Sequence, residues 1–294
     1  MPTTNSKPRV ALFGLGLMGS GMARRLLGAG FPLAVYNRNA SKAEALRQEG
    51  AEVAASPRDA AKNAAIAISM VADDNASRTT WLGDLGALAA LPPGAVLIES
   101  STLTVNWVKE LAAAATAHGC ELIDAPVTGS KAHAQSGELN FLVGGSAAAL
   151  DTARPVLAAM GKSIEHVGPA GSGALLKLIN NFLCAVQAVS AGEALALIEK
   201  SGLDRAKVID VLTAGAPGSP LLKTMFARMT SGDYTPNFRL ALMAKDVGYA
   251  MKEGEQHGVP LTTAATALAA FQRAMAAGDG DDDFSVVVEP IRGR

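Results

Sequence analysis

Two hydrophobic patterns alternate along the first 170 residues of the chain. Short apolar runs, typical of buried parallel strands, are separated by stretches in which apolar residues recur every three or four positions, as in amphipathic helices. The strand-like runs are residues 9–13, 32–36, 52–54, 65–71, 95–99, 121–125, 139–144 and 163–167. This alternation predicts an α/β domain over residues 1–170 with a Rossmann-type, doubly wound sheet.

A different pattern begins at residue 171. Residues 171–202 contain no proline and carry apolar residues at three- and four-residue spacing, which predicts one long, largely buried helix between two domains. Residues 203–294 keep the helical spacing and predict an all-helical C-terminal domain. Its expected helices cover 204–214, 219–229, 240–257 and 260–277.

Lys177 and Asn181 lie near the start of the long predicted helix, four residues apart and therefore on one side of it. An ammonium group in an apolar helix is unfavourable unless it has a partner or a function. We expect Lys177 to face a cleft between the two domains. The alternatives are that its side chain extends along the helix until the amine reaches solvent, and that Asn181 only contributes to helix packing.

Composition narrows the class of protein. The chain has 294 residues and a net charge of −1, which gives no electrostatic reason to expect binding to nucleic acid or to an anionic membrane. Cys120 and Cys184 lie in apolar runs and suggest reduced thiols in a cytoplasmic protein. The four histidines have no metal-site spacing. No membrane span is expected, because even the longest apolar stretch contains Lys177 and Glu193.

A glycine-rich turn follows the first predicted strand. Gly14, Gly16 and Gly19 enclose Leu17 and Met18 in a GxGxxG pattern that leads directly into a predicted helix. The first glycine permits a tight turn, the second lets a pyrophosphate approach the backbone, and the third lets helix and strand pack closely. In this context the pattern predicts a dinucleotide site formed by the backbone of the turn and the start of the helix.

Asn37 and Arg38 end the second predicted strand, where an NAD-binding protein usually has an acidic residue that binds the ribose hydroxyls. Asn37 has no charge to repel a 2′-phosphate, and Arg38 can pair with one. We therefore expect NADP, with NADPH preferred over NADH. The alternative for Arg38 is a solvated surface arginine.

Polar residues also follow later strands, at the edge where a parallel sheet presents ligands. Val71, Ala72 and Asp73 close the fourth predicted strand and are expected to lie under the bound cofactor. Ser101 and Thr102 follow the fifth, and we expect Ser101 to contact substrate and Thr102 the cofactor. The alternative for these hydroxyls is an N-cap of the next helix.

Residues 126–137 are predicted to be a long loop rich in glycine and short hydroxyl side chains. Thr128, Gly129 and Ser130 offer donors that can hold a substrate carboxylate. Lys131 and His133 are as consistent with solvated residues as with functional ones.

Together these residues resemble the β-hydroxyacid dehydrogenase family, whose members include 3-hydroxyisobutyrate dehydrogenases and glyoxylate/succinic semialdehyde reductases. The resemblance covers residues 8–290 and rests on five motifs in the right order: 14–27, 99–102, 124–137, 171–181 and the pair Lys245-Asp246. It implies that Lys177 and Asn181 form the catalytic pair and that Lys245 lies near cofactor and substrate. The alternative for Lys245 is a surface ion pair with Asp246.

Some positions depart from the 3-hydroxyisobutyrate dehydrogenase pattern. Val105 replaces a proline, and Gly129-Ser130-Lys131, with His133 in place of a glycine, is more similar to the glyoxylate/succinic semialdehyde branch. This similarity implies an NADPH-dependent reductase of a small carboxylated aldehyde or 2-oxo acid. An NAD-linked 3-hydroxyacid dehydrogenase and a dinucleotide-binding module without catalysis remain alternatives.

In the reductase reading, hydride transfer to a carbonyl leaves an alkoxide, and Lys177 would act as the general acid/base that protonates it. The long apolar helix and the helical domain also suggest a homodimer or homotetramer.

Overall fold

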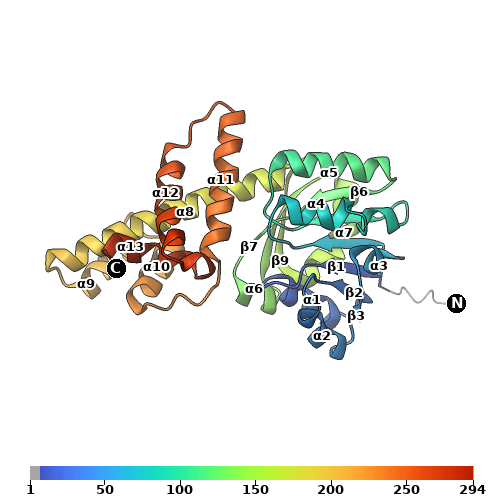
Figure 1. Cartoon of the computed structure of the whole chain (residues 1–294), viewed down its shortest axis with the longest axis horizontal. Coiled ribbons are helices and arrows are strands. Elements are labelled where there is room, and N and C mark those ends of the chain that lie inside the picture. The colour runs from blue at the N-terminus through green and yellow to red at the C-terminus, as the bar shows by residue number, and fades with distance from the viewer. Residues whose placement is uncertain (1–6, 294) are drawn as a thin grey trace. The chain divides into compact units, whose positions relative to one another are not determined.

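The computed structural model describes residues 7–293. The chain divides into two compact units, Met1–Lys177 and Leu178–Arg294 (Figure 1). The first contains a sheet covered by helices and the second is helical, so the predicted α/β fold class with a helical C-terminal part is confirmed.

The sheet of unit 1 has the strand order β3-β2-β1-β4-β5-β6-β8-β7, with β9 paired to β8. The strands β1 to β6 are parallel, whereas β8 is antiparallel to β6 and β7. The strand order reverses at β1, so β1 and β4 form the switch point at which such sheets bind ligands. The bounds are β1 Val10–Phe13, β2 Leu33–Tyr36, β3 Glu52–Val53, β4 Ile66–Ser69, β5 Val96–Glu99, β6 Glu121–Asp124, β7 Val127–Thr128, β8 Leu139–Gly144 and β9 Gly161–Gly168.

Helices cover both faces of this sheet, with α4 and α5 on one face and α1 and α2 on the other (Figure 1). The central strands are buried along their whole length, which explains why they appear in the sequence as continuous apolar runs. The bounds are α1 Gly19–Gly28, α2 Ser41–Gln48, α3 Pro57–Ala61, α4 Asp74–Leu82, α5 Val105–Ala117, α6 Lys131–Ser136 and α7 Ala147–Met160, with a 3₁₀ turn η1 at Leu88–Ala90.

The prediction of a continuous loop over residues 126–137 was wrong. The segment contains the short strand β7 and the short helix α6, and Gly137 ends α6 with a φ of 78°. Ala134 of α6 is buried and packs against Gly21, where an added Cβ would come within 3.0 Å of the Ala134 Cβ. A single buried alanine gives too weak a hydrophobic pattern to predict a helix.

The long helix α8 spans Ser172–Ser201, as predicted, and unit 1 ends within it at Lys177. It is less buried than expected, because Ile179, Leu183 and Leu197 are 46%, 51% and 70% exposed. By length and composition alone, α8 would suffice for a membrane span, which differs from the expectation from the sequence. It is the only helix within residues 7–293 with this property. Half of its most apolar window is buried within the described part of the protein.

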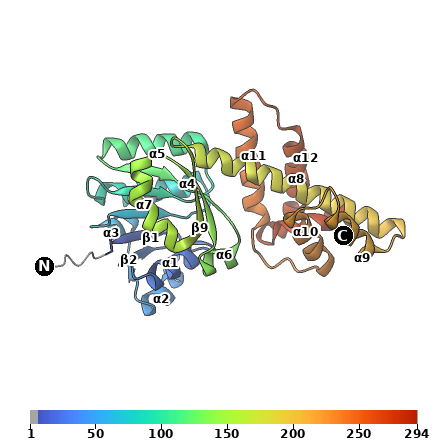
Figure 2. The same cartoon turned by 180° about the vertical axis from the view of Figure 1, so that it is seen from behind.

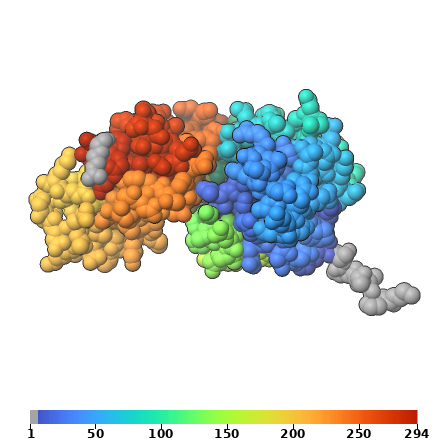
Figure 3. Space-filling model, turned by 60° about the horizontal axis from the view of Figure 1, so that its bottom comes forward, coloured from blue at the N-terminus to red at the C-terminus, as the bar shows by residue number. Residues whose placement is uncertain are grey.

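Unit 2 packs α8 residues from Ala185 to Leu195 with apolar residues of the later helices, including Phe226, Met243 and Phe271. The bounds are α9 Arg205–Ala214, α10 Pro220–Ser231, α11 Leu240–Gln256 and α12 Thr262–Ala276. The C-terminal segment, with η2 Asp279–Asp281, η3 Phe284–Val287 and α13 Val288–Arg292, packs against the helices of the same unit (Figures 2 and 3). This segment contributes Phe284 and Val286–Val288 to the core, although no helical pattern predicted it.

Candidate active site

The glycine-rich turn has the geometry that its sequence predicts. Gly14 has a φ of 92°, and a Cβ at this position would lie 2.2 Å from the carbonyl oxygen of Met70. A Cβ at Gly19 would lie 1.9 Å from the carbonyl oxygen of Gly14, so both positions exclude any side chain. By contrast, nothing lies within 4 Å of a Cβ at Gly16. The open side of the turn is therefore where a phosphate group can approach the backbone.

Leu17 is exposed and Met18 is half-buried, so the backbone between the glycines borders solvent. Helix α1 begins at Gly19, directly after this backbone, and its Ser20 N–H donates a hydrogen bond of 3.2 Å to the Gly16 carbonyl oxygen. The other N–H groups at a helix start have no acceptor within the helix. Such a helix start attracts anions. The turn thus has room for the pyrophosphate of a dinucleotide beside Gly16.

Asn37 lies at the carboxyl end of β2, and its side chain holds the glycine-rich turn. Its Oδ1 accepts a hydrogen bond of 2.8 Å from the Leu15 N–H, and its Nδ2 donates one of 2.8 Å to the Asn39 carbonyl. The structure therefore gives Asn37 a supporting role beneath the turn. Arg38 is exposed, and no hydrogen bond or ion pair involves it within residues 7–293. Its guanidinium is consequently available for an anionic ligand.

The connections after β4 and β5 are joined by their own side chains. The Ser101 Oγ accepts a hydrogen bond of 2.8 Å from the Val71 N–H, and Ser101 is 2% exposed. Ser101 thus lies behind the connection and supports Val71. Ala72 is exposed, whereas the Asp73 carboxylate caps α4 by accepting from the Ala76 N–H.

Thr102 is half-buried, and the N-cap of α5 is Thr104, so Thr102 does not have the capping role that the sequence left open. Thr104 also links the two connections, because its hydroxyl donates to the Asp74 Oδ2 at 2.6 Å. The backbone from 70 to 74 and that from 100 to 104 therefore form one connected edge at the carboxyl ends of β4 and β5.

The predicted carboxylate-binding residues lie between β7 and α6. Gly129 is exposed and has a φ of 127°, while Thr128 and Ser130 are half-buried. The Ser130 N–H donates a hydrogen bond of 3.0 Å to the Nδ1 of His133. His133 therefore holds Ser130 in place, which favours a local structural role for this histidine over a solvated one.

Asp124, the last residue of β6, holds the start of the helix that carries Lys177. Its two carboxylate oxygens accept hydrogen bonds of 2.7 Å from the N–H groups of Gly171 and Ala174. Burial raises the pKa of the Asp124 carboxyl, and the backbone donors oppose this effect. The pair of bonds caps the first turn of α8 from a residue far away in the sequence. Lys177, half-buried, follows Ala174 by about one turn.

In unit 2, Asn181 is 2% exposed, and its Nδ2 donates a hydrogen bond of 2.6 Å to the Oδ2 of Asp246. The Lys245 Nζ lies 2.9 Å from the other carboxylate oxygen and 4.8 Å from the Tyr249 ring centroid. Lys245 and Asp246 therefore form an ion pair. Because Asp246 is buried, this ion pair does not lie on the surface. Asp246 orients both the predicted catalytic amide and the predicted site lysine.

Three buried acids were not predicted as functional: Glu99 and Asp124 in unit 1 and Asp246 in unit 2. Each falls within one of the five motifs of the sequence: 99–102, 124–137 and the pair Lys245-Asp246. A stronger signal was available, because an acid that ends an otherwise apolar strand, as Glu99 and Asp124 do, must be buried and therefore needs a specific partner. Which partner it finds depends on the fold.

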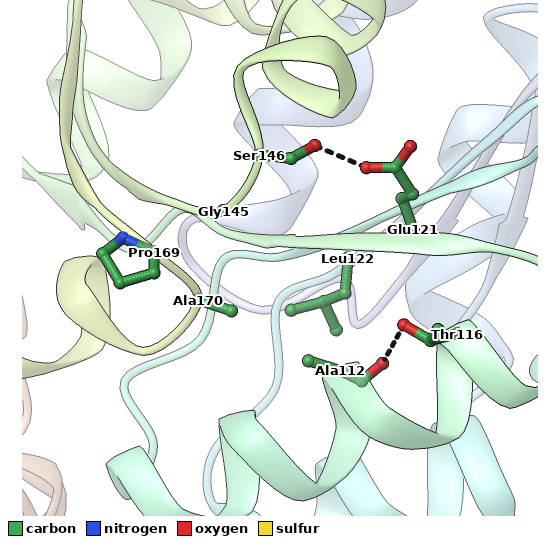
Figure 4. Close-up of a pocket in the computed structure, with 8 residues that line it drawn as sticks. All are labelled: Ala112, Thr116, Glu121, Leu122, Gly145, Ser146, Pro169 and Ala170. Atoms are coloured by element: carbon green, nitrogen blue, oxygen red, sulfur yellow. Dashed lines mark hydrogen bonds between the residues drawn. The ribbon is translucent and has the colours of Figure 1, made fainter.

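A pocket of about 310 Å³ lies elsewhere in unit 1, between α5, β6 and the segment before α8 (Figure 4). In the close-up the Ser146 hydroxyl donates to the Glu121 carboxylate on one side, and Pro169 and Ala170 form the other. None of the sequence-predicted site residues lines it. Its lining residues are Ala112, Thr116, Glu121, Leu122, Gly145, Ser146, Pro169 and Ala170.

Comparison with known proteins gives two family matches. Residues 9–168 match the family described as the NAD-binding domain of 6-phosphogluconate dehydrogenase. Residues 171–291 match the family described as NAD-binding of NADP-dependent 3-hydroxyisobutyrate dehydrogenase. The boundary between the matches falls immediately before α8.

Similar proteins align over nearly their whole lengths. An NAD-dependent L-serine dehydrogenase of Pseudomonas aeruginosa is 36% identical, with 97% of this chain and 99% of the relative covered. A glyoxylate/succinic semialdehyde reductase of Arabidopsis thaliana is 34% identical over 96% of this chain and 98% of the relative. The solved structure of Mycobacterium tuberculosis 3-hydroxyisobutyrate dehydrogenase with L-serine is 33% identical, covers 97% of this chain and 99% of its own, and has a TM-score of 0.89.

Proposed function

The chain belongs to the β-hydroxyacid dehydrogenase family of NAD(P)-dependent oxidoreductases, and from that premise we propose that it is an NADPH-dependent reductase of a small carboxylated aldehyde or 2-oxo acid. The proposal rests on one observation: the Asp124 carboxylate accepts hydrogen bonds from Gly171 and Ala174 at the start of α8. It attaches the helix that carries Lys177 to the carboxyl end of β6, the edge of the sheet at which the glycine-rich turn also lies.

In this proposal, different segments of unit 1 bind different parts of the cofactor and the substrate. The backbone of residues 14–19 would hold the pyrophosphate, and Val71, Ala72 and Thr102 would border the nicotinamide half. Thr128, Gly129 and Ser130 would hold the substrate carboxylate. A bound nicotinamide supplies the hydride, so the protein has to orient the reactants and supply a proton.

Lys177 performs the proton transfer in this proposal. As the carbonyl carbon gains the hydride, its oxygen takes the electron pair of the π bond, and the Lys177 ammonium donates a proton to that oxygen. The amine then regains a proton from solvent. Asn181 follows on the same side of α8 and, held by Asp246, would donate a hydrogen bond to the substrate oxygen. Lys245 would contribute positive charge near the cofactor and substrate.

The decisive experiment compares Lys177→Ala with Lys200→Ala, an exposed lysine at the other end of the same helix. We expect Lys177→Ala to lower kcat about 10³-fold, within the range of general acid catalysis, and to leave NADPH binding near normal. Lys200→Ala should match the unmodified enzyme. Full turnover in Lys177→Ala would refute the mechanism.

The preference for NADPH rests on Arg38, which is exposed and available for a 2′-phosphate, and on the absence of an acid at the end of β2. Arg38→Ala should raise KM for NADPH about tenfold and leave KM for NADH nearly unchanged, since one charge-assisted contact is lost. Initial rates with glyoxylate, succinic semialdehyde and tartronate semialdehyde, followed by NADPH absorbance, would identify the substrate.

A second candidate is an NAD-linked 3-hydroxyacid dehydrogenase that works in the oxidative direction. It is favoured by the Pseudomonas aeruginosa relative, named an NAD-dependent L-serine dehydrogenase. Rates with 3-hydroxyisobutyrate or L-serine and NAD⁺ that exceed the NADPH-linked rates of reduction would select this candidate.

We also propose that the enzyme is cytoplasmic and works as a homodimer or homotetramer. Support for the oligomer comes from large apolar side chains that are exposed on α8 and α9 and between them: Ile179, Leu183, Leu197, Leu203 and Val211. Ile179 and Leu183 are four residues apart on one side of α8, and exposed apolar residues that lie together often mark an interface. Light scattering after gel filtration should give at least twice the 30.0 kDa chain mass, and a monomer would contradict this proposal.

A further inference from the structure

Glu99 is a fully buried acid at the carboxyl end of β5. Three donors converge on its carboxylate. The Ser77 hydroxyl and the Trp81 Nε1 donate to Oε2 at 2.6 and 2.8 Å, and the Ser101 N–H donates to Oε1 at 2.9 Å. No ion pair involves Glu99 within the described part of the chain. These three hydrogen bonds, together with one to the Ser101 side chain, are therefore what compensates for its burial.

The bonds to α4 fix where the carboxylate lies. Ser77 and Trp81 are one turn apart on that helix, and Ser77 is itself held by the Nε1 of Trp107 on α5, at 2.9 Å. Because the indole can only donate, the Ser77 hydroxyl must accept from Trp107 and is free to donate to Glu99. The carboxylate is thus fixed to two helices that flank the end of β5.

The hydrogen bond from the Ser101 N–H connects Glu99 to the backbone at the carboxyl ends of β4 and β5. Glu99 holds the Ser101 N–H, and the Ser101 Oγ accepts from the Val71 N–H at 2.8 Å. One carboxylate thereby sets the distance between the connection after β4 and the connection after β5. Those connections contain Val71, Ala72 and Thr102, for which we expect contact with the cofactor.

We propose that Glu99 is a positioning residue for the nicotinamide half of the cofactor, acting through Ser101 on the backbone at Val71. The inference rests on the proposed function, because it requires a dinucleotide at this edge. With the ribose beside β2 and the pyrophosphate at the turn after β1, the other half of the molecule must extend over the ends of β4 and β5. Glu99 itself is buried and does not touch the cofactor.

Glutamine cannot replace Glu99 fully. Its carboxamide has one acceptor oxygen, so its NH₂ must face either the Ser101 N–H or the Trp81 Nε1, and both of these are donors. Ser101→Ala is the milder change, because it removes the acceptor for the Val71 N–H and the side-chain hydrogen bond of Ser101 to Glu99 but leaves the carboxylate and its other donors in place. The second variant keeps the test valid if Glu99→Gln does not fold.

The chain has two tryptophans, and both belong to this network. Intrinsic fluorescence therefore reports on the network itself, and NADPH titration can be followed by tryptophan quenching and checked by calorimetry. We expect Ser101→Ala and Glu99→Gln each to raise the dissociation constant of NADPH about tenfold, and kcat at saturating NADPH to change less than threefold. The double variant should lose little more than either single one, because both act through the same link.

Matched controls come from the rim of the pocket in Figure 4, where the Ser146 hydroxyl donates to Glu121. Glu121→Gln and Ser146→Ala make the same chemical changes in the same unit, and Ser146→Ala also removes the N-cap of α7. We expect both to bind NADPH as the unmodified protein does, even where they lower Tm.

Two results would overturn the inference. If Ser101→Ala binds NADPH with unchanged affinity, or if the controls weaken binding equally, Glu99 has only a structural role. If the unmodified protein binds neither NADPH nor NADH, the proposed function fails as well. The two failures are distinguishable, because the first leaves cofactor binding and turnover of the unmodified enzyme intact.

Discussion

Removal of the Asp124 carboxylate should separate the first turn of α8 from the sheet. The side chain is completely buried and accepts two backbone hydrogen bonds of 2.7 Å, from Gly171 and Ala174. Asp124→Ala leaves both N–H groups buried without an acceptor. Asp124→Asn keeps one acceptor oxygen and turns an NH₂ group toward the other donor.

The magnitude follows from these two bonds. A hydrogen bond to a charged group contributes about 1.5–3 kcal/mol. Part of this is offset by the cost of burying the carboxylate, the same effect that raises its pKa. We expect Asp124→Ala to lower the free energy of unfolding by about 3 kcal/mol and Asp124→Asn by about half as much. For a unit of this size, about 3 °C per kcal/mol gives a fall in Tm near 9 °C for the alanine variant.

Differential scanning calorimetry of the full chain would measure the effect, with Asp151→Asn as the control. Asp151 is exposed on α7 and lies 3.6 Å from Arg154, so its replacement should change Tm by less than about 1 °C. We also expect kcat to fall in Asp124→Asn, because Lys177 follows the released first turn of α8 and depends on that turn for its position. Equal Tm values for Asp124→Asn and Asp151→Asn would refute the reasoning.

Three further outcomes are expected. Gly19→Ala should abolish cofactor binding and lower Tm, because the added Cβ would lie 1.9 Å from the Gly14 carbonyl oxygen. Calorimetry with and without NADPH would measure both effects, and normal binding would contradict the turn geometry. Arg292→Met should cost about 2 kcal/mol in urea unfolding, because it breaks two hydrogen bonds to Glu199 on α8 and one each to Glu289 and the Met229 carbonyl. A change below about 0.5 kcal/mol would show that the contacts of Arg292 do not stabilise unit 2. Burial raises the pKa of Glu99 above its ordinary 4.5, so the native state binds the proton more tightly than the unfolded state. The stabilisation by protonated Glu99 is therefore complete below about pH 4.5 and falls as pH rises through the raised pKa. The difference in Tm between the unmodified protein and Glu99→Gln should decrease from pH 5 to pH 7. An increase would show that the pKa of Glu99 is lowered in the folded protein.

The pattern of apolar residues was sufficient to predict the alternating strands and helices of unit 1 and the long helix α8. Periodicity reports which side of an element is buried, and this property is local. The glycine-rich turn was also predictable, because its requirement for positive φ and close packing at Gly14 and Gly19 is met by residue type alone. The segment 126–137 was not, because α6 buries one alanine and gives no periodic pattern.

The supporting residues of the site depended on tertiary structure. Asp124 meets Gly171 across 47 residues, Asn181 meets Asp246 across 65, and Glu99 reaches Ser77 on the preceding helix. No spacing rule joins positions so far apart, since their meeting depends on strand order and on the packing of helices against the sheet.

The sequence by itself determined the kinds of element, the dinucleotide turn and the Lys177–Asn181 spacing, because each depends on neighbouring residues. Only the tertiary structure decided which buried acid supports which part of the site, and that Ser101 and Asn37 hold loops in place. The physical reason is that a buried polar group must find a partner, and the fold determines which partners are within reach.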